Sequence, residues 1–233
     1  MLNLRSALGA MVVVASAFFA AGPASAAILV EGDSSGGFSS IASCEGVCSI
    51  SPNGKQLKWG NVGSVLPGST LTSVNTSWSA LTNASDVVLA TLVWKNVPTL
   101  PGFTPVLFNA AFNLDFTFTA PTGAEDSASF DLSILNTGLF GDLMSGLAMN
   151  DLSGLSFDLG DVGVSNIRFD LADGPGTFLH NIWYNPEAAT STMYILADFT
   201  DISVAEVPEP ASLALLGAGL FGLGMMRRRR WMR

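Results

Sequence analysis

Hydrolytic chemistry would have to depend on His180, because it is the only histidine in the sequence. A serine hydrolase needs such a base beside a serine nucleophile and an orienting carboxylate. Gly32-Asp33-Ser34-Ser35-Gly36 has the spacing of a Gly-x-Ser-x-Gly motif, but the sequence predicts no helix after it, whereas in many hydrolases the serine stands on a sharp strand-to-helix turn. We therefore interpret His180 as a structural histidine held by one hydrogen bond, and predict no catalytic triad.

Carboxylates could support a second kind of catalysis, since a glycosidase needs two of them across a cleft, roughly 5 to 10 Å apart. The candidate carboxylates are Asp115, Asp131, Asp158, Asp170 and Asp198. Each occupies an outward position of a predicted strand. A carboxylate at such a position is explained by its contact with solvent, without any catalytic role. We predict no catalytic residues, and hence a non-enzymatic protein.

Four acids in one stretch could instead supply oxygen ligands to calcium: Asp151, Asp158, Asp161 and Asp170. Neither an EF-hand loop nor a calcium-binding nonapeptide repeat spaces them. The sequence therefore predicts no metal and no cofactor, with calcium bound by these acids as the alternative.

Aromatic residues raise the question of sugar binding, because exposed rings stack on pyranose rings. Trp94 belongs to a segment that is apolar on both faces, so we assign it to the core. Trp183 and Tyr184 precede Asn185-Pro186 in a loop-like stretch and are the better candidates for ligand binding. Core packing is the alternative for both, because large aromatic side chains dominate buried area.

The two cysteines, Cys44 and Cys48, are separated by three residues. A redox centre would favour two intervening residues, and a structural zinc would need about four ligands. In an oxidising compartment we expect a single disulfide that closes a short loop.

The segments that carry these residues alternate between apolar and polar side chains. Phe112, Leu114, Phe116 and Phe118 alternate with polar residues, which is typical of a half-buried strand. The same pattern, or a short apolar run, predicts further strands over 56–59, 71–78, 87–94, 130–135 and 193–204. Many short strands divided by Gly, Pro and Asn indicate an all-β fold, an antiparallel β-sandwich that is jelly-roll-like.

The alternation changes phase twice between Leu155 and Leu171, at Gly160 and at Asn166. One extra residue turns every later side chain to the opposite face, so each change predicts a turn or a bulge. The sequence also suggests a short helix over 139–149, a suggestion that Gly141 and Gly146 weaken.

Charge excludes one class of partner. Of the ten Lys and Arg, only Lys55, Lys58, Lys95 and Arg168 lie in the body over residues 27–206, whereas all nineteen acids lie between Glu31 and Glu209. A surface this acidic repels phosphate backbones, so we expect no nucleic-acid partner.

The N-terminus has the three parts of a secretory signal peptide: Arg5, the apolar stretch Leu8 to Ala21, and the small residues Ala24-Ser25-Ala26. We predict cleavage by signal peptidase after Ala26. An exported body over residues 27–206 then suits one domain.

At the C-terminus, residues 207–233 begin with Val207-Pro208-Glu209-Pro210. Sixteen uncharged residues follow, over 211–226, and a cluster of Arg227, Arg228, Arg229 and Arg230 ends the segment. The apolar run predicts a single, short transmembrane helix whose arginines stay cytoplasmic, leaving the body outside the inner membrane. An ordinary tail anchor is the alternative.

This constellation resembles the PEP-CTERM sorting signal of Gram-negative bacteria that make exopolysaccharide. The resemblance implies processing by a membrane enzyme called exosortase. It also implies that Pro208, Glu209 and Pro210 form the recognition motif, that residues 211–226 are a transient anchor, and that the arginines are the stop-transfer cluster.

The body is similar to a group of PEP-CTERM domains called choice-of-anchor K, with a related THxN set. The similarity is carried by Cys44, Leu57-Lys58-Trp59-Gly60 and the strand Leu89 to Trp94. It implies a β-rich extracellular domain of unassigned biochemistry. The Thr-His-x-Asn signature itself is absent, because Val93-Trp94-Lys95-Asn96 stands in its place.

Together these features predict an exported cell-surface or extracellular-matrix protein associated with exopolysaccharide or biofilm. Its body would be anchored at the inner membrane in the periplasm, and would reach the surface after processing. A carbohydrate-binding module or adhesin is the alternative, followed by an envelope hydrolase.

Overall fold

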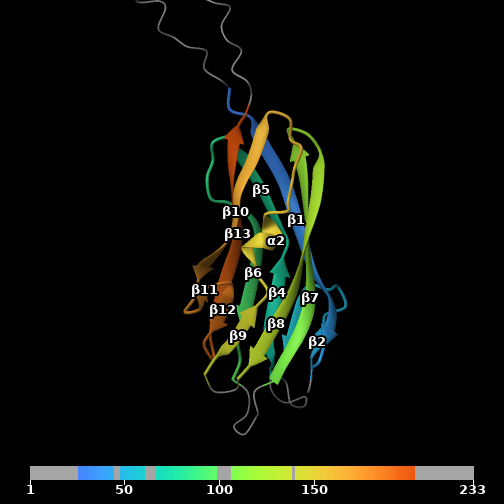
Figure 1. Cartoon of the computed structure of the whole chain (residues 1–233), viewed down its shortest axis with the longest axis vertical. Coiled ribbons are helices and arrows are strands. Elements are labelled where there is room, and N and C mark those ends of the chain that lie inside the picture. Colours follow the sequence, from blue (N-terminus) through green and yellow to red (C-terminus); the bar gives the residue numbers. More distant parts are fainter. Residues whose placement is uncertain (1–25, 45–47, 61–66, 99–105, 138–139, 203–233) are drawn as a thin grey trace, which may run out of the picture. The chain divides into compact units, whose positions relative to one another are not determined.

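The computed structural model of the chain describes residues 26–44, 48–60, 67–98, 106–137 and 140–202. Ala27–Ser203 form one compact unit, most of which is drawn in colour in Figure 1. The predicted sorting tail and the signal peptide before Ala26 lie outside the described residues. In the part of the chain that is described, no helix is long and apolar enough to cross a membrane.

The larger of two antiparallel sheets has seven strands, in the order β11-β12-β9-β8-β7-β1-β5. In chain order they are β1 (Leu29–Ala42), β5 (Thr76–Leu81), β7 (Val106–Ala120), β8 (Ala124–Asn136), β9 (Asp142–Ser145), β11 (Thr177–Leu179) and β12 (Ile182–Asn185).

The smaller sheet has six strands, in the order β10-β13-β6-β4-β3-β2. In chain order they are β2 (Ser49–Ile50), β3 (Gln56–Trp59), β4 (Ser69–Val74), β6 (Val87–Lys95), β10 (Val162–Asp173) and β13 (Thr190–Asp201). A four-residue helix, α2 (Met149–Leu152), lies between β9 and β10 in the chain. The prediction of an all-β antiparallel sandwich is confirmed.

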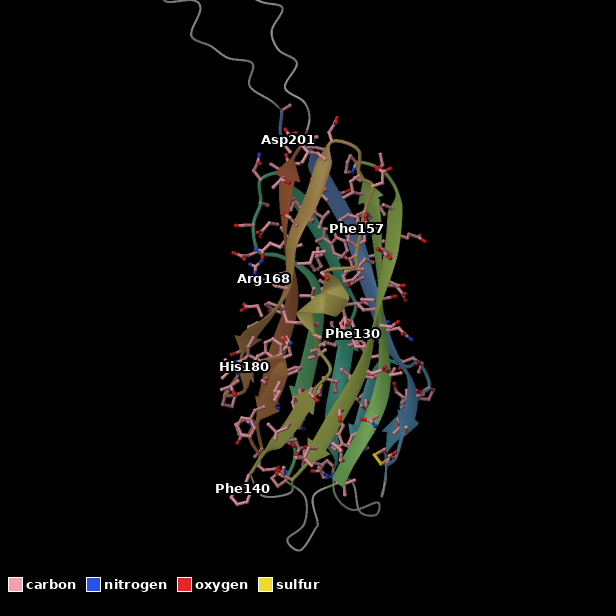
Figure 2. All side chains as sticks on the ribbon, viewed as in Figure 1. Phe130, Phe140, Phe157, Arg168, His180 and Asp201 are labelled. Carbon is pink, nitrogen blue, oxygen red and sulfur yellow. A yellow bond between two sulfur atoms is a disulfide. The ribbon has the colours of Figure 1, made fainter. Side chains whose placement is uncertain are left out.

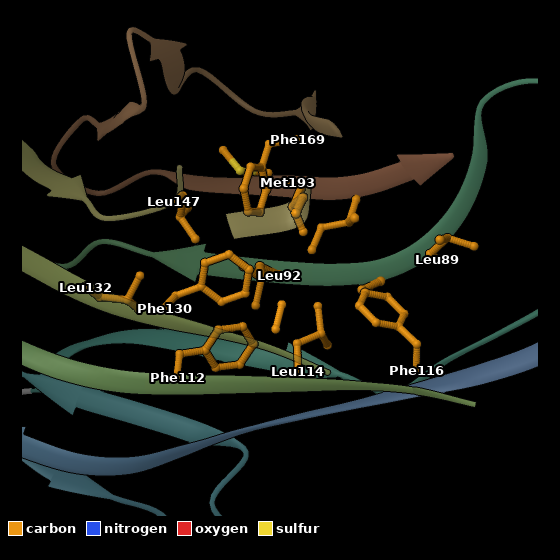
Figure 3. Packing of buried hydrophobic residues seen from close by; sticks show 14 of the residues in the cluster. Leu89, Leu92, Phe112, Leu114, Phe116, Phe130, Leu132, Leu147, Phe169 and Met193 are labelled. Atoms are coloured by element: carbon orange, nitrogen blue, oxygen red, sulfur yellow. The ribbon is translucent and has the colours of Figure 1, made fainter. Parts of the chain in front are cut away.

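The predicted alternation determines which side chains fill the space between the sheets. Along β7, Phe112, Leu114, Phe116 and Phe118 are buried, while the residues between them face outward or lie half-buried. Phe112 pairs in register with Phe130 of β8, and their rings stack with centroids 5.9 Å apart. Figure 3 shows these rings packed with side chains of the smaller sheet, so the aromatic core joins the two layers.

Strand β1 lacks the apolar alternation that predicts a strand because its central inward positions, Gly32, Ser34 and Gly36, carry small residues. Gly36 lies opposite aromatic packing: a Cβ there would come within 2.8 Å of the Phe112 ring and 2.4 Å of Ser73 Oγ. A Cβ on Gly32 would come within 2.5 Å of both the Thr117 carbonyl and the Trp78 ring. The small residues therefore leave the room that neighbouring rings occupy.

The predicted single strand over 71–78 is wrong. The chain there forms two strands, β4 and β5, which are divided by Asn75 and belong to different sheets. A helix over 139–149 is also wrong, because β9 occupies its middle. Both Gly141 and Gly146 have positive φ, at 93° and 100°, which is incompatible with a right-handed helix.

Both predicted phase changes correspond to observed irregularities. Gly160, with φ at 67°, lies in the turn between Leu159 and Val162, which form an isolated bridge. Asn166, with φ at 52°, lies where the β10–β13 register shifts between Ser165 and Arg168. A bulge of this kind bends the strand and strengthens its twist.

Candidate functional site

The residues considered for hydrolysis do not meet. His180 is exposed and has a left-handed φ of 52°, in the turn between β11 and β12. Asp115, Asp131, Asp158 and Asp170 are exposed as predicted. Asp198 is half-buried and accepts a hydrogen bond of 2.8 Å from Asn166, so it has a structural role beside the bulge.

The acids considered for calcium are also dispersed on the surface. Asp151, Asp158, Asp161 and Asp170 are all exposed. Over the described ranges, no group of three or more His, Cys, Asp and Glu side chains is placed to hold a metal ion. Asp158 instead accepts a hydrogen bond from the Gly160 amide, at 3.3 Å, and shapes the turn before β10.

Trp183 cannot be a sugar platform, because it is 0 % exposed. Its ring packs edge-on against Trp94, with centroids 5.1 Å apart, and its indole donates a 3.1 Å hydrogen bond to Ser191 Oγ. It is therefore a core residue, as the alternative interpretation held. Tyr184, the next residue, points to the opposite face of β12, where it lies half-buried.

Tyr184 belongs to an apolar patch on the outer face of the larger sheet. We define this outer patch as Phe140, Leu179, Ile182 and Tyr184. Leu179 and Ile182 are cross-strand partners, and the Tyr184 hydroxyl donates to the Phe140 carbonyl. Phe140 is 78 % exposed and Leu179 66 %, so the patch presents apolar surface to solvent.

The predicted disulfide between Cys44 and Cys48 is present, with Cα atoms 6.3 Å apart. It links a residue shortly after β1 to the residue that precedes β2, and both cysteines pack against the core.

The most unusual chemistry of the described residues is a buried row of polar side chains that the sequence analysis did not identify. Asp142 of β9 pairs with Asn185 of β12. On its other side, the β8–β9 register continues beyond Leu135–Leu143 and brings Asn136 beside Asp142. All three side chains are buried, in the positions that continue the inward row of Ile134, Met144 and Trp183.

Asp142 is the centre of this row. Its Oδ2 accepts a 3.0 Å hydrogen bond from the Trp59 indole, and its Oδ1 accepts one of 2.9 Å from the Thr137 amide. Burial raises the pKa of Asp142 above its ordinary value, because a carboxylate loses solvation there, while the two hydrogen bonds oppose the rise. The hydrogen bonds from Trp59 and Thr137 therefore compensate only in part for the solvation that the Asp142 carboxylate loses on burial.

Glu187 adds a second carboxyl group, from the turn between β12 and β13. Both of its oxygens are shielded from solvent and have no hydrogen-bond partner of good geometry. Burial and then the negative charge of Asp142 raise the pKa of Glu187, and the nearby Gly141 amide partly opposes this. Glu187 follows Asn185 by two residues, and Asn185 is the cross-strand partner of Asp142, so the turn begins beside Asp142. We call Asn136, Asp142, Asn185 and Glu187 the oxygen cluster.

Hydrogen bonds around the oxygen cluster join the two sheets. Trp59 of β3 reaches Asp142 of β9, and Asn185 of β12 donates through Nδ2 to the Trp94 carbonyl of β6 at 2.9 Å. Asn96 donates a hydrogen bond of 2.9 Å through its Nδ2 to the Asn185 carbonyl. Each bond crosses between the layers, so this end of the sandwich is held by polar contacts as well as by the core.

One signal could have identified part of the cluster. Asn136 continues the period-two row of Phe130, Leu132 and Ile134, which predicts that it points inward. Asn136 also begins the sequence Asn136-Thr137-Gly138, whose residue types are common in turns and favour the end of a strand. Glu187 offered no such pattern.

Comparison with known proteins identifies the tail rather than the sandwich. Residues 206–230 match the family model of the PEP-CTERM protein-sorting motif. Searches of curated proteins and of solved structures found no match. The similarity of the body to choice-of-anchor K domains stays a prediction.

The matched tail marks an exported protein with a membrane-anchored sorting signal that exosortase processes. The chain is thus a PEP-CTERM protein, identified by the sorting motif at its C-terminus.

Proposed function

We propose that the chain is a non-enzymatic cell-surface or extracellular-matrix protein associated with exopolysaccharide. Its β-sandwich would pass through the periplasm, stay anchored at the inner membrane until processing, and then be displayed outside. The sorting motif at residues 206–230 carries this proposal, because it makes export and sorting the chain's identified activity.

The arrangement of the sandwich supports display. Asp201, from which the chain continues toward the motif, and Phe140 lie at opposite ends of the sandwich in Figure 2. A sandwich held through Asp201 would leave Phe140, a residue of the outer patch, at its far end. The acidic body repels anionic polymers, so we expect neutral glycan as the matrix component.

Localisation of three forms of the protein tests the proposal: the natural chain, a chain without residues 207–233, and Glu209→Gln. We expect the natural chain at the surface without its C-terminal peptide, and the truncated chain released. Glu209→Gln keeps the apolar run and the arginines but alters the motif, so it should stay in the membrane with its C-terminal peptide intact. An ordinary tail anchor would instead leave that peptide on both full-length forms. Identical location and processing of all three would refute the proposal.

Non-enzymatic function is tested by an activity screen on glycan and ester substrates. We expect no turnover. Turnover that disappears in His180→Ala would favour the envelope hydrolase instead.

The outer patch favours a second candidate, a carbohydrate-binding module or adhesin. Its exposed Phe140 and half-buried Tyr184 could contact a sugar ring, a role that buried Trp183 cannot have. On a glycan array, Phe140→Ala and Tyr184→Ala should lose binding that Leu81→Ala retains. Leu81 is the control because it is 52 % exposed on β5, outside the patch. No binding by the natural chain would dismiss this candidate.

A further inference from the structure

The oxygen cluster contains several acceptor atoms and too few donors. The side-chain oxygens of Asn136 and Asn185 are buried without a hydrogen-bond partner, and so are both oxygens of Glu187. Asn136 is 4 % exposed and Asn185 0 %. Leaving a buried polar group without a hydrogen bond costs free energy, on the order of 1–3 kcal/mol for each group, so these four oxygens on three side chains call for a physical explanation.

The register places these oxygens near one another. Asn136, Asp142 and Asn185 occupy the same row on β8, β9 and β12, and neighbouring side chains in such a row have Cβ atoms roughly 5 Å apart. Glu187 lies in the turn that follows β12, two residues after Asn185, and both of its carboxylate oxygens are shielded from solvent. The Asn185 amide cannot simply be reversed, because its Nδ2 donates to the Trp94 carbonyl. Its Oδ1 is therefore fixed as an acceptor.

We propose that the oxygen cluster is a calcium site, in which Asn136, Asp142, Asn185 and Glu187 supply side-chain oxygens to the ion. Calcium takes six to eight oxygen ligands in flexible geometry, from carboxylates, amide carbonyls and water. Two carboxylates neutralise its charge, and the two amides complete the protein's share of the ligands. Magnesium fits less well, since it keeps most of its water and demands a regular octahedron.

The surroundings of Asp142 resemble those of a metal-binding carboxylate. Its hydrogen bonds from the Trp59 indole and the Thr137 amide use one lone pair on each oxygen and orient the group, while each oxygen keeps a second lone pair for an ion. The site differs from the exposed acids at 151–170 that the sequence suggested. It has only two carboxylates, and half of its ligand side chains are amides.

Two explanations without a metal compete with this one. Asp142 and Glu187 could share a proton, and a buried water could donate to the amide oxygens. In either case calcium would have no effect on the protein. Replacing a carboxylate by its amide would then leave the protein equally stable, or make it more stable, with or without calcium.

Calcium binding is tested on the full chain in detergent, after removal of metals with a chelator. Adding calcium to about 100 times its dissociation constant should raise the Tm by roughly 5–10 °C. Glu187→Gln and Asp142→Asn should each weaken binding about tenfold or more. The matched control is Asp131→Asn, which removes the same charge from an exposed position on β8 and should leave the calcium titration unchanged.

Terbium gives a second measurement that does not depend on stability. It substitutes for calcium and luminesces when a nearby tryptophan is excited, and Trp59 contacts the proposed ligand Asp142. We expect luminescence that calcium displaces and that Glu187→Gln lacks. The proposal is refuted if calcium leaves the Tm unchanged and terbium stays dark in the natural chain. It is equally refuted if both responses persist in the Glu187→Gln and Asp142→Asn variants, since the ions would then bind elsewhere.

Discussion

Replacing Trp59 with Phe tests whether the hydrogen bond to Asp142 stabilises the sandwich. Trp94 provides a matched control. The two tryptophans are neighbours in the core, with ring centroids 6.0 Å apart, and both are 0 % exposed. They differ in one respect: the Trp59 indole donates to Asp142 at 3.0 Å, whereas the Trp94 indole nitrogen has no partner.

Both replacements remove the same atoms, so their losses of packing largely cancel in a comparison. Trp59→Phe also removes a hydrogen bond to a charged group, worth about 1.5–3 kcal/mol, and leaves Asp142 with the Thr137 amide alone. Trp94→Phe removes a buried donor that already lacked a partner. We therefore expect Trp59→Phe to lose at least about 1.5–3 kcal/mol more free energy of unfolding than Trp94→Phe.

Urea unfolding followed by far-ultraviolet circular dichroism measures this difference without relying on tryptophan fluorescence. A chelator is included in every sample, so that an ion bound by Asp142 does not contribute. In an Asp142→Asn background the gap between the two variants should narrow, as a double-mutant cycle requires for residues in contact. The reasoning fails if Trp94→Phe is as destabilising as Trp59→Phe.

Three further changes have expected outcomes that unfolding measurements can check. Gly36→Ala should lower the free energy of unfolding by about 1–3 kcal/mol, because the added Cβ would overlap an aromatic ring. Gly154→Ala is the control and should be neutral, because no atom lies within 4 Å of its added Cβ. Equal effects of the two changes would contradict the packing argument. Changing Cys44 and Cys48 together to Ser should cost about 2 kcal/mol, the entropy expected for so short a loop, and a reductant should then have no further effect. Arg168→Ala should cost less than about 1 kcal/mol, because its ion pairs are at the surface; a loss several times larger would show that the bulge depends on it.

The sequence predicted the strands whose inward positions carry large apolar residues. Phe112 and its neighbours on β7 are the clearest example, because a half-buried strand leaves a period-two pattern. Strand β1 left none, since Gly32 and Gly36 fill inward positions that face large rings. The boundary at Asn75 was missed for another reason: Ser and Thr fill most positions of β4, so its sequence has no clear alternation that would show where the strand ends.

The oxygen cluster could not have been predicted as a site, although its residues were visible. Asn136 and Asn185 precede turns, where Asn is common, and Glu187 follows a proline. What brings them together is the pairing of β8, β9 and β12, which joins positions up to 49 residues apart in the sequence through cross-strand register. The tail is the opposite case, because its motif is contiguous and legible without any structure.

The bulge in β10 has a consequence for how copies of this protein meet. Among the described edge strands, β2, β5 and β11 span six residues or fewer, whereas β10 spans 12 and pairs only with β13. A long straight edge invites a strand from another molecule, and so seeds aggregation. The register shift between Ser165 and Arg168 interrupts the row of free amides and carbonyls, and exposed Asp170 adds charge beside it. A strand of another molecule would therefore find no continuous ladder to extend along β10.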